Sequence, residues 1–144
     1  MIKKTITYTD YFDTARTEDF YFNLSKTEVL ELDLAEDGGL ERFFDKIVSE
    51  MDNRRIVEMF KKIILLAYGE RSLDGRRFIK GPELSLAFSQ TEAYTELFIE
   101  LASNAEAAAE FMNGIVPKPN SKDQQRLSQN GQAVKPQVSQ QNQA

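Results

Sequence analysis

The N-terminal part of the chain alternates between apolar and polar side chains with a period of two. The apolar positions of this pattern are Ile2, Ile6, Tyr8, Phe20, Phe22 and Leu24. Alternating β-branched and aromatic residues predict two strands, and residues 10–15 between them predict a turn, in which Tyr11 and Phe12 are unusual. Because a lone hairpin is marginal in water, we expect its apolar face to rest on helices.

A helical pattern begins at Ser25. The stretch Ser25-Lys-Thr-Glu28 is a capping box, in which the serine oxygen accepts from the Glu28 amide while the glutamate reaches back. It predicts a short helix to about Leu34, although the alternating leucines over residues 30–34 also allow a strand. The sequence Asp37-Gly-Gly39 then ends this helical pattern.

Two amphipathic helices follow. Apolar residues recur at i, i+3, i+4 and i+7 over residues 40–51 and again over residues 56–67. Asp52 or Asn53 can cap the second helix, and Gly69 suits its C-terminal cap. The second helix is apolar over much of its circumference, so we expect it to be the central and most buried element.

Three more helices are predicted after a turn at Leu73-Asp-Gly75 and a brief extended piece over residues 76–80. Their expected starts are Gly81-Pro82, a second capping box at Ser89-Gln-Thr-Glu92, and Asn104, with Gly114 closing the last helix.

The patterns together predict a mostly α domain of the α+β class, with the N-terminal β-hairpin packed on a bundle of four to five helices. All 15 aromatic residues lie within residues 1–111, whereas the last 28 residues contain none and include eight glutamines. Such a segment cannot bury enough apolar surface to offset its ordering entropy. We therefore expect a globular domain over residues 1–116 and a disordered Gln-rich tail over residues 117–144.

Charge is segregated along the chain. Residues 27–52 carry nine acidic and two basic side chains, residues 53–80 carry eight basic and three acidic ones, and residues 81–116 carry six acidic and no basic ones. A basic middle between acidic flanks suggests contacts within the fold or between neighbouring copies, and ordinary solvated helix faces are the plain alternative. The candidate residues of a self-association or partner patch are Arg71, Arg76, Arg77, Lys80, Glu92, Glu96 and Glu100.

Composition argues against catalysis and against nucleic-acid binding. The chain has no His and no Cys, so the commonest general base and the strongest nucleophile are missing. Glutamates at helical i,i+4 spacing over residues 92–100 could ligate Mg²⁺ or Ca²⁺, but no second acidic motif has matching spacing, which favours a solvated face. The predicted domain is net acidic, which disfavours phosphate-backbone binding, and no apolar run approaches the ~20 residues of a membrane span. We therefore expect that the protein is not an enzyme and that it binds no cofactor and no metal ion.

Three groups of stretches carry a family resemblance. They are Lys3–Tyr8 with Glu18–Leu24, Ala67–Gly69 with Arg77–Lys80, and Phe88–Tyr94 followed by Leu97-Phe98 and Asn113–Pro117. Over residues 1–117 they resemble the tail assembly chaperones of long-tailed bacteriophages that infect Gram-positive hosts. The Gln-rich tail lies outside this resemblance.

The resemblance implies a non-enzymatic role. Such chaperones coat the tape measure protein, a long and largely apolar helical chain, and keep it soluble until tail tube subunits displace them. It further implies action in the host cytoplasm, absence from the mature virion, and in many relatives a longer frameshifted form. Two alternatives stay open: a head–tail connector factor, which would be found in finished virions, and a nucleic-acid-binding regulator, which would show steep salt-dependent DNA affinity.

Overall fold

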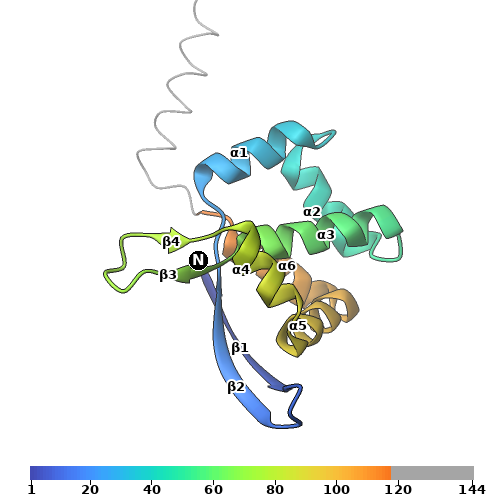
Figure 1. Ribbon diagram of the computed structural model, residues 1–144. Coiled ribbons are helices and arrows are strands. Elements are labelled where there is room, and N and C mark those ends of the chain that lie inside the picture. The colour runs from blue at the N-terminus through green and yellow to red at the C-terminus, as the bar shows by residue number, and fades with distance from the viewer. Residues whose placement is uncertain (118–144) are drawn as a thin grey trace, which may run out of the picture.

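The computed structural model describes residues 1–117, which form six helices and a four-stranded antiparallel sheet (Figure 1). The strands are β1 (Ile2–Thr9), β2 (Ala15–Phe22), β3 (Tyr68–Arg71) and β4 (Phe78–Ile79). The helices are α1 (Lys26–Ala35), α2 (Gly39–Ser49), α3 (Arg54–Ala67), α4 (Pro82–Ser89), α5 (Glu92–Ser103) and α6 (Ala105–Ile115). The predicted α+β class is confirmed, with six helices in the described part in place of four to five.

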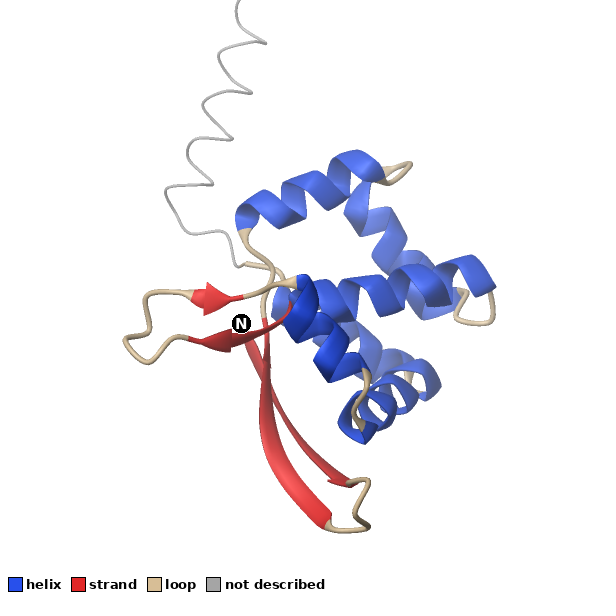
Figure 2. Cartoon of the chain, viewed as in Figure 1, coloured by secondary structure: helices blue, strands red, loops and turns tan. Residues whose placement is uncertain are grey.

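The predicted N-terminal hairpin is confirmed, with pairing from Ile2 opposite Phe22 to Thr9 opposite Ala15; β2 begins at Ala15, which was predicted in the turn, and ends before Leu24. The sheet is larger than the sequence indicated, because β3 adds to the end of β2 and β4 adds to β3, in the order β1-β2-β3-β4. Only Tyr21 and Phe22 of β2 pair with β3. The two hairpins therefore leave the helical body in different directions (Figure 2).

The hydrophobic core lies between the sheet and the helices, and α3 contributes most to it. Its buried residues are Ile56, Phe60, Ile63, Ile64 and Ala67. The prediction that this helix is the most buried element is confirmed. Helix α6 contributes four buried residues and helices α2 and α5 three each, and α5 packs against β1.

Aromatic rings join the sheet to α4. Phe88 stacks on Tyr68 with ring centroids 4.3 Å apart, and it also meets Phe20 and Phe22 at 5.3 and 5.7 Å. Phe111 of α6 packs edge-on against Phe22 at 5.2 Å. Rings in these offset and edge-to-face arrangements stabilise one another beyond the area that they bury, so this cluster fixes the angle between the hairpin and the helices.

Three of the predicted helix starts have the expected caps. The Ser25 oxygen accepts from the Glu28 amide at 3.2 Å, and the Glu28 carboxylate accepts from the Ser25 amide at 2.9 Å. The Asn53 side chain accepts from the Arg55 amide, and Asn104 caps α6. Capping is a local interaction, and for this reason it can be read from sequence spacing.

The second predicted capping box is wrong. Ser89 is the last residue of α4, and its hydroxyl donates to the Leu86 carbonyl oxygen. Thr91 is the N-cap of α5 in its place, since its hydroxyl oxygen accepts from the Tyr94 amide at 3.2 Å. The chain thus passes from α4 to α5 in two residues, which leaves no room for a box that begins at Ser89.

Neither glycine that was expected to close a helix does so. Gly69 lies in β3, where a Cβ atom would sit 2.6 Å from a ring carbon of Phe78 and 2.7 Å from the carbonyl oxygen of Ile79. Gly114 lies within α6, where a Cβ atom would sit 2.8 Å from the Ile2 side chain. Gly69 is therefore required by the close approach of the β4 backbone, whereas a side chain at Gly114 would have to displace the end of the Ile2 side chain; neither glycine forms a left-handed cap.

The first helix, α1, is the least integrated element. Each of its residues is at least partly exposed, and Figure 1 shows it at the margin of the helical body. Among the polar contacts that hold it, Lys80 Nζ lies 2.6 Å from Glu28 Oε1, and the Leu40 amide donates to Asp33. Burial raises the pKa of Glu28, but the bonds from Lys80 and Ser25 outweigh burial and place its pKa below the usual range.

The Glu28–Lys80 pair predicts a pH-dependent difference between the wild-type protein and a Glu28→Gln variant. Glutamine keeps the reciprocal cap but carries no charge for Lys80. Because the pKa of Glu28 is depressed in the folded state, its contribution is complete above the unfolded pKa of about 4.3 and is lost as the pH falls through the folded value. Urea unfolding at a series of pH values should show a stability gap at pH 7 that closes in acid. A gap that does not change with pH would contradict this role.

The tail predicted over residues 117–144 lies, apart from Pro117, outside the described residues. The predicted domain boundary accordingly stays a prediction.

Candidate functional site

The turn between β1 and β2 is organised by one carboxylate. Asp10 accepts hydrogen bonds from the Phe12 and Thr14 amides, both at 2.9 Å, and from Arg16 Nε at 2.6 Å. These bonds, with that of Arg16 the strongest, hold the pKa of Asp10 below its usual range. Because the backbone donors of the turn are satisfied by Asp10, the chain here has a defined shape although it lies at the surface.

The organised turn presents two aromatic side chains to solvent. Phe12 is 90% exposed and Tyr11 is 75% exposed. The Tyr11 hydroxyl donates to Glu92 Oε1 at 2.8 Å, and this bond to a carboxylate raises the pKa of Tyr11. Glu92 is the first residue of α5. The bond from Tyr11 therefore holds the tip of the hairpin against the start of this helix.

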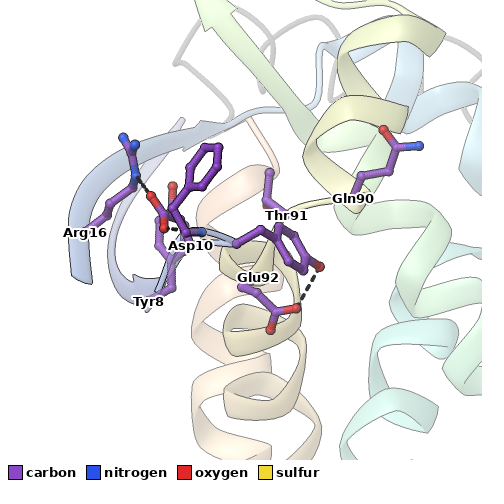
Figure 3. A pocket seen from close by; sticks show the side chains of 8 residues that line it. Tyr8, Asp10, Arg16, Gln90, Thr91 and Glu92 are labelled. Carbon is purple, nitrogen blue, oxygen red and sulfur yellow. Dashed lines mark hydrogen bonds and ion pairs between the residues drawn. The ribbon is translucent and has the colours of Figure 1, made fainter. Parts of the chain in front are cut away.

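A shallow cleft of about 270 Å³ lies between the hairpin tip and the start of α5. Its lining residues are Tyr8, Asp10, Tyr11, Phe12, Arg16, Gln90, Thr91 and Glu92. Figure 3 shows Asp10 and Arg16 on the hairpin side of the cleft and Gln90, Thr91 and Glu92 on the side of the helices. Tyr8 is held by a hydrogen bond to Glu18, which raises the pKa of Tyr8.

The cleft is better suited to binding a partner protein than to catalysing a reaction. Its carboxylates are already engaged, Asp10 with Arg16 and Glu92 with Tyr11, and aromatic carbon forms much of its wall. Such a surface can take an apolar side chain of a partner within a polar rim. Within residues 1–117, no group of three or more acidic side chains is placed to hold a metal ion. None of the helices described is long and apolar enough to cross a bilayer.

The structure divides the seven residues of the predicted charge patch into separate groups. Arg71 lies on β3, where its guanidinium stacks 4.1 Å from the Tyr21 ring centroid. Arg76 and Arg77 follow in the β3–β4 turn, and Arg76 Nε lies 4.0 Å from Asp74. Lys80 is not part of this group, because it pairs with Glu28 of α1. The structure therefore brings the three arginines, but not Lys80, to the β3–β4 hairpin.

The acidic members of the predicted patch lie on α5. Glu92 binds Tyr11 and Glu100 lies 3.0 Å from Lys4 Nζ, so these two glutamates hold the hairpin against α5. Glu96 is exposed between them. Figure 1 shows α5 and the β3–β4 turn on different sides of the molecule, so the basic and acidic groups do not meet within one copy.

Sequence reasoning did not name Tyr11 and Phe12 as site residues. The signal for them was present, since two consecutive aromatics in a tight turn are out of keeping with turn chemistry. What could not be read from the sequence is the partner of Tyr11, because Glu92 is 81 residues away along the chain.

Comparison with known proteins identifies the family. No curated protein and no solved structure matches the chain. A family model described as phage tail assembly chaperone matches residues 1–144. The match includes the Gln-rich tail, which the residue resemblance had left out. Since the match extends over all 144 residues, the chain belongs to the phage tail assembly chaperone family.

Proposed function

We propose that this protein is a non-enzymatic chaperone that binds the tape measure protein and keeps it soluble until tail tube subunits displace it. The observation that carries the proposal is the family match over residues 1–144. On this proposal the protein acts in the host cytoplasm and leaves before the virion is complete. A Gram-positive host and a longer frameshifted form are further predictions from the family resemblance.

The hairpin tip supports the proposal as a contact surface. Phe12 projects from a turn that Asp10 holds in shape, so an apolar partner can bind it without much further loss of entropy. Burying one such ring contributes about 1.5–3 kcal/mol. A contact of this size is weak enough to be reversed, as displacement by tube subunits requires. Many copies along one long partner would together supply the affinity.

Coexpression with the tape measure protein tests the proposal. We expect the wild-type chaperone to raise the soluble fraction of the tape measure protein, and Phe12→Ala to lower this effect, with binding about tenfold weaker or more. Leu34→Ala is the matched control, because Leu34 is also an exposed apolar residue but lies on α1, at the other end of the molecule from the tip of the β1–β2 hairpin (Figure 1).

The two possible failures are distinguishable. If the wild-type protein leaves the tape measure protein insoluble, the proposed function is wrong. If the wild-type protein and Phe12→Ala are equally effective, the function stands and the hairpin tip is not the contact surface. Circular dichroism of both variants should match that of the wild type, since both side chains are exposed.

A further inference from the structure

A groove between α2 and α6 has an apolar floor. It measures about 270 Å³ and shares no residue with the cleft at the hairpin tip. Ile47 and Met112 are buried in its floor, beside the partly buried ring of Phe44. Val48, which is 45% exposed, lies at its edge. Because apolar surface is stabilised when it is removed from water, a further segment of chain that covered this groove would be held there.

One wall of the groove is acidic. Glu41 and Asp45 lie one helical turn apart on α2, and both line the groove. Within residues 1–117, neither side chain forms a hydrogen bond or an ion pair. The other wall, formed by Ala109 and Asn113, adds no positive charge, because α6 contains no basic residue. The groove thus offers two carboxylates to a basic segment.

The two basic residues of α2 lie outside the groove. Arg42 and Lys46 each follow one of the groove carboxylates by one residue, which turns them about 100° around the helix axis. Neither of them lines the groove. The Arg42 side chain lies against Gly38, at the start of the helix. The acidic wall is therefore a local feature of the groove side of α2.

The chain continues after α6 with a basic segment, residues 118–127. This segment carries three bases, Lys118, Lys122 and Arg126, and a single acidic residue. It ends in Leu127, the first branched aliphatic residue after the end of the described part. A segment of this composition cannot fold alone, but it can bind a folded surface that is apolar and has an acidic wall.

We propose that residues 118–127 bind back into the groove between α2 and α6 of their own chain. Leu127 packs on the apolar floor, while Lys122 and Arg126 face the two carboxylates of the wall. The segment thereby covers apolar surface that the six helices leave open. This inference goes beyond tape measure binding and does not depend on it, because the groove and the hairpin tip are separate surfaces.

The covalent connection makes a weak contact sufficient. The ten residues from Pro117 to Leu127 can span about 33 Å, whereas Asn113 of the groove lies only about 6 Å back along α6. A segment joined in this way has an effective concentration of about 1 mM, so an intrinsic Kd of about 1 mM gives about half occupancy. The same segment of a second copy would compete only when the protein itself approached such a concentration.

A nitroxide label tests the proposal in the full chain. The sequence has no cysteine, so Ser128→Cys allows a single label to be placed next to Leu127. We expect the label to broaden the NMR methyl signals of Val48 and Met112, which lie at the groove. The signal of Leu73, in the β3–β4 turn that Figure 1 shows away from α2, should change little. The same sample with the nitroxide reduced gives the reference spectrum.

Substitutions in the segment should release it from the groove. Lys122→Glu/Arg126→Glu and Leu127→Ser should each reduce the broadening at both methyl signals several-fold, because each removes one component of the contact. Lys135→Glu makes the same change of charge outside residues 118–127, so it is the matched control and should leave the broadening unchanged. Equal broadening in Lys122→Glu/Arg126→Glu and in the wild-type sequence would overturn the proposal.

A charge exchange identifies the two carboxylates as the partners of the segment. Glu41→Lys/Asp45→Lys should reduce the broadening, and the broadening should return when Lys122→Glu/Arg126→Glu is added to the same chain. Both altered side chains of α2 are exposed, so the circular dichroism should stay that of the wild type. A fourfold variant that does not regain the broadening would contradict the pairing of these charges.

Mixing distinguishes the segment's own groove from that of a second copy. Nitroxide-labelled protein without isotopes is mixed, at micromolar concentration, with isotope-labelled protein that has no nitroxide, and we expect no broadening. Broadening in this mixture as strong as that within one chain would mean that the segment binds a neighbouring copy, and it would overturn the proposal. Unbroadened signals of Val48 and Met112 in the singly labelled chain would do the same. None of these measurements involves the tape measure protein, so they fail or succeed independently of the proposed function.

Discussion

Phe60→Ala is expected to lower the free energy of unfolding by about 3–5 kcal/mol. The Phe60 ring is 0% exposed and lies in the middle of α3, the helix with the most buried residues. Removing the ring loses the free energy gained by transferring it from water into the core. It also leaves a cavity that the surrounding helices fill only in part. Because a domain of this size has about 5–15 kcal/mol of stability in total, the variant should be close to unfolding at physiological temperature.

Urea unfolding followed by circular dichroism measures this effect. Phe12→Ala is the matched control, since it makes the same chemical change at an exposed site and should stay within about 0.5 kcal/mol of the wild type. A Phe60→Ala protein with nearly wild-type stability that no longer binds the tape measure protein would show that this stripe of α3 is an interface and not core.

Gly69→Ala is expected to destabilise the protein by about 1–3 kcal/mol. The added methyl group would lie 2.7 Å from the carbonyl oxygen of Ile79, which is backbone and cannot rotate away, and 2.6 Å from the Phe78 ring. To make room, β4 must move from β3, and with it the β3–β4 turn that carries Leu73.

The control for this substitution is Gly81→Ala. Gly81 has an extended backbone, with φ at 169°, and nothing lies within 4 Å of an added Cβ atom. This change should be neutral or slightly stabilising, because alanine reduces the freedom of the unfolded chain. If urea unfolding gave the two variants the same stability, β4 could move away from β3 with no loss of free energy of unfolding, and the prediction for Gly69→Ala would be wrong.

Local patterns in the sequence determined most of the secondary structure. The alternation over residues 2–24 is sufficient for a hairpin, and the spacing in Ser25–Glu28 is sufficient for a cap, because the interacting groups are neighbours along the chain. The apolar period of α3 likewise predicted its burial, since a helix that is apolar around most of its circumference can only be stable inside. The excess of charge in each segment was also readable, as a property of composition.

Tertiary structure decided which of these features serve the fold and which are left for partners. Leu30 and Leu34 of α1 are apolar but remain exposed, whereas Leu32 packs against the core, because α1 lies at the margin of the helical body. Of the predicted charge patch, Lys80, Glu92 and Glu100 have partners in their own chain, at sequence separations of 52, 81 and 96 residues. Nothing local encodes contacts at such distances, because they depend on where packing of the apolar faces brings distant parts of the chain together.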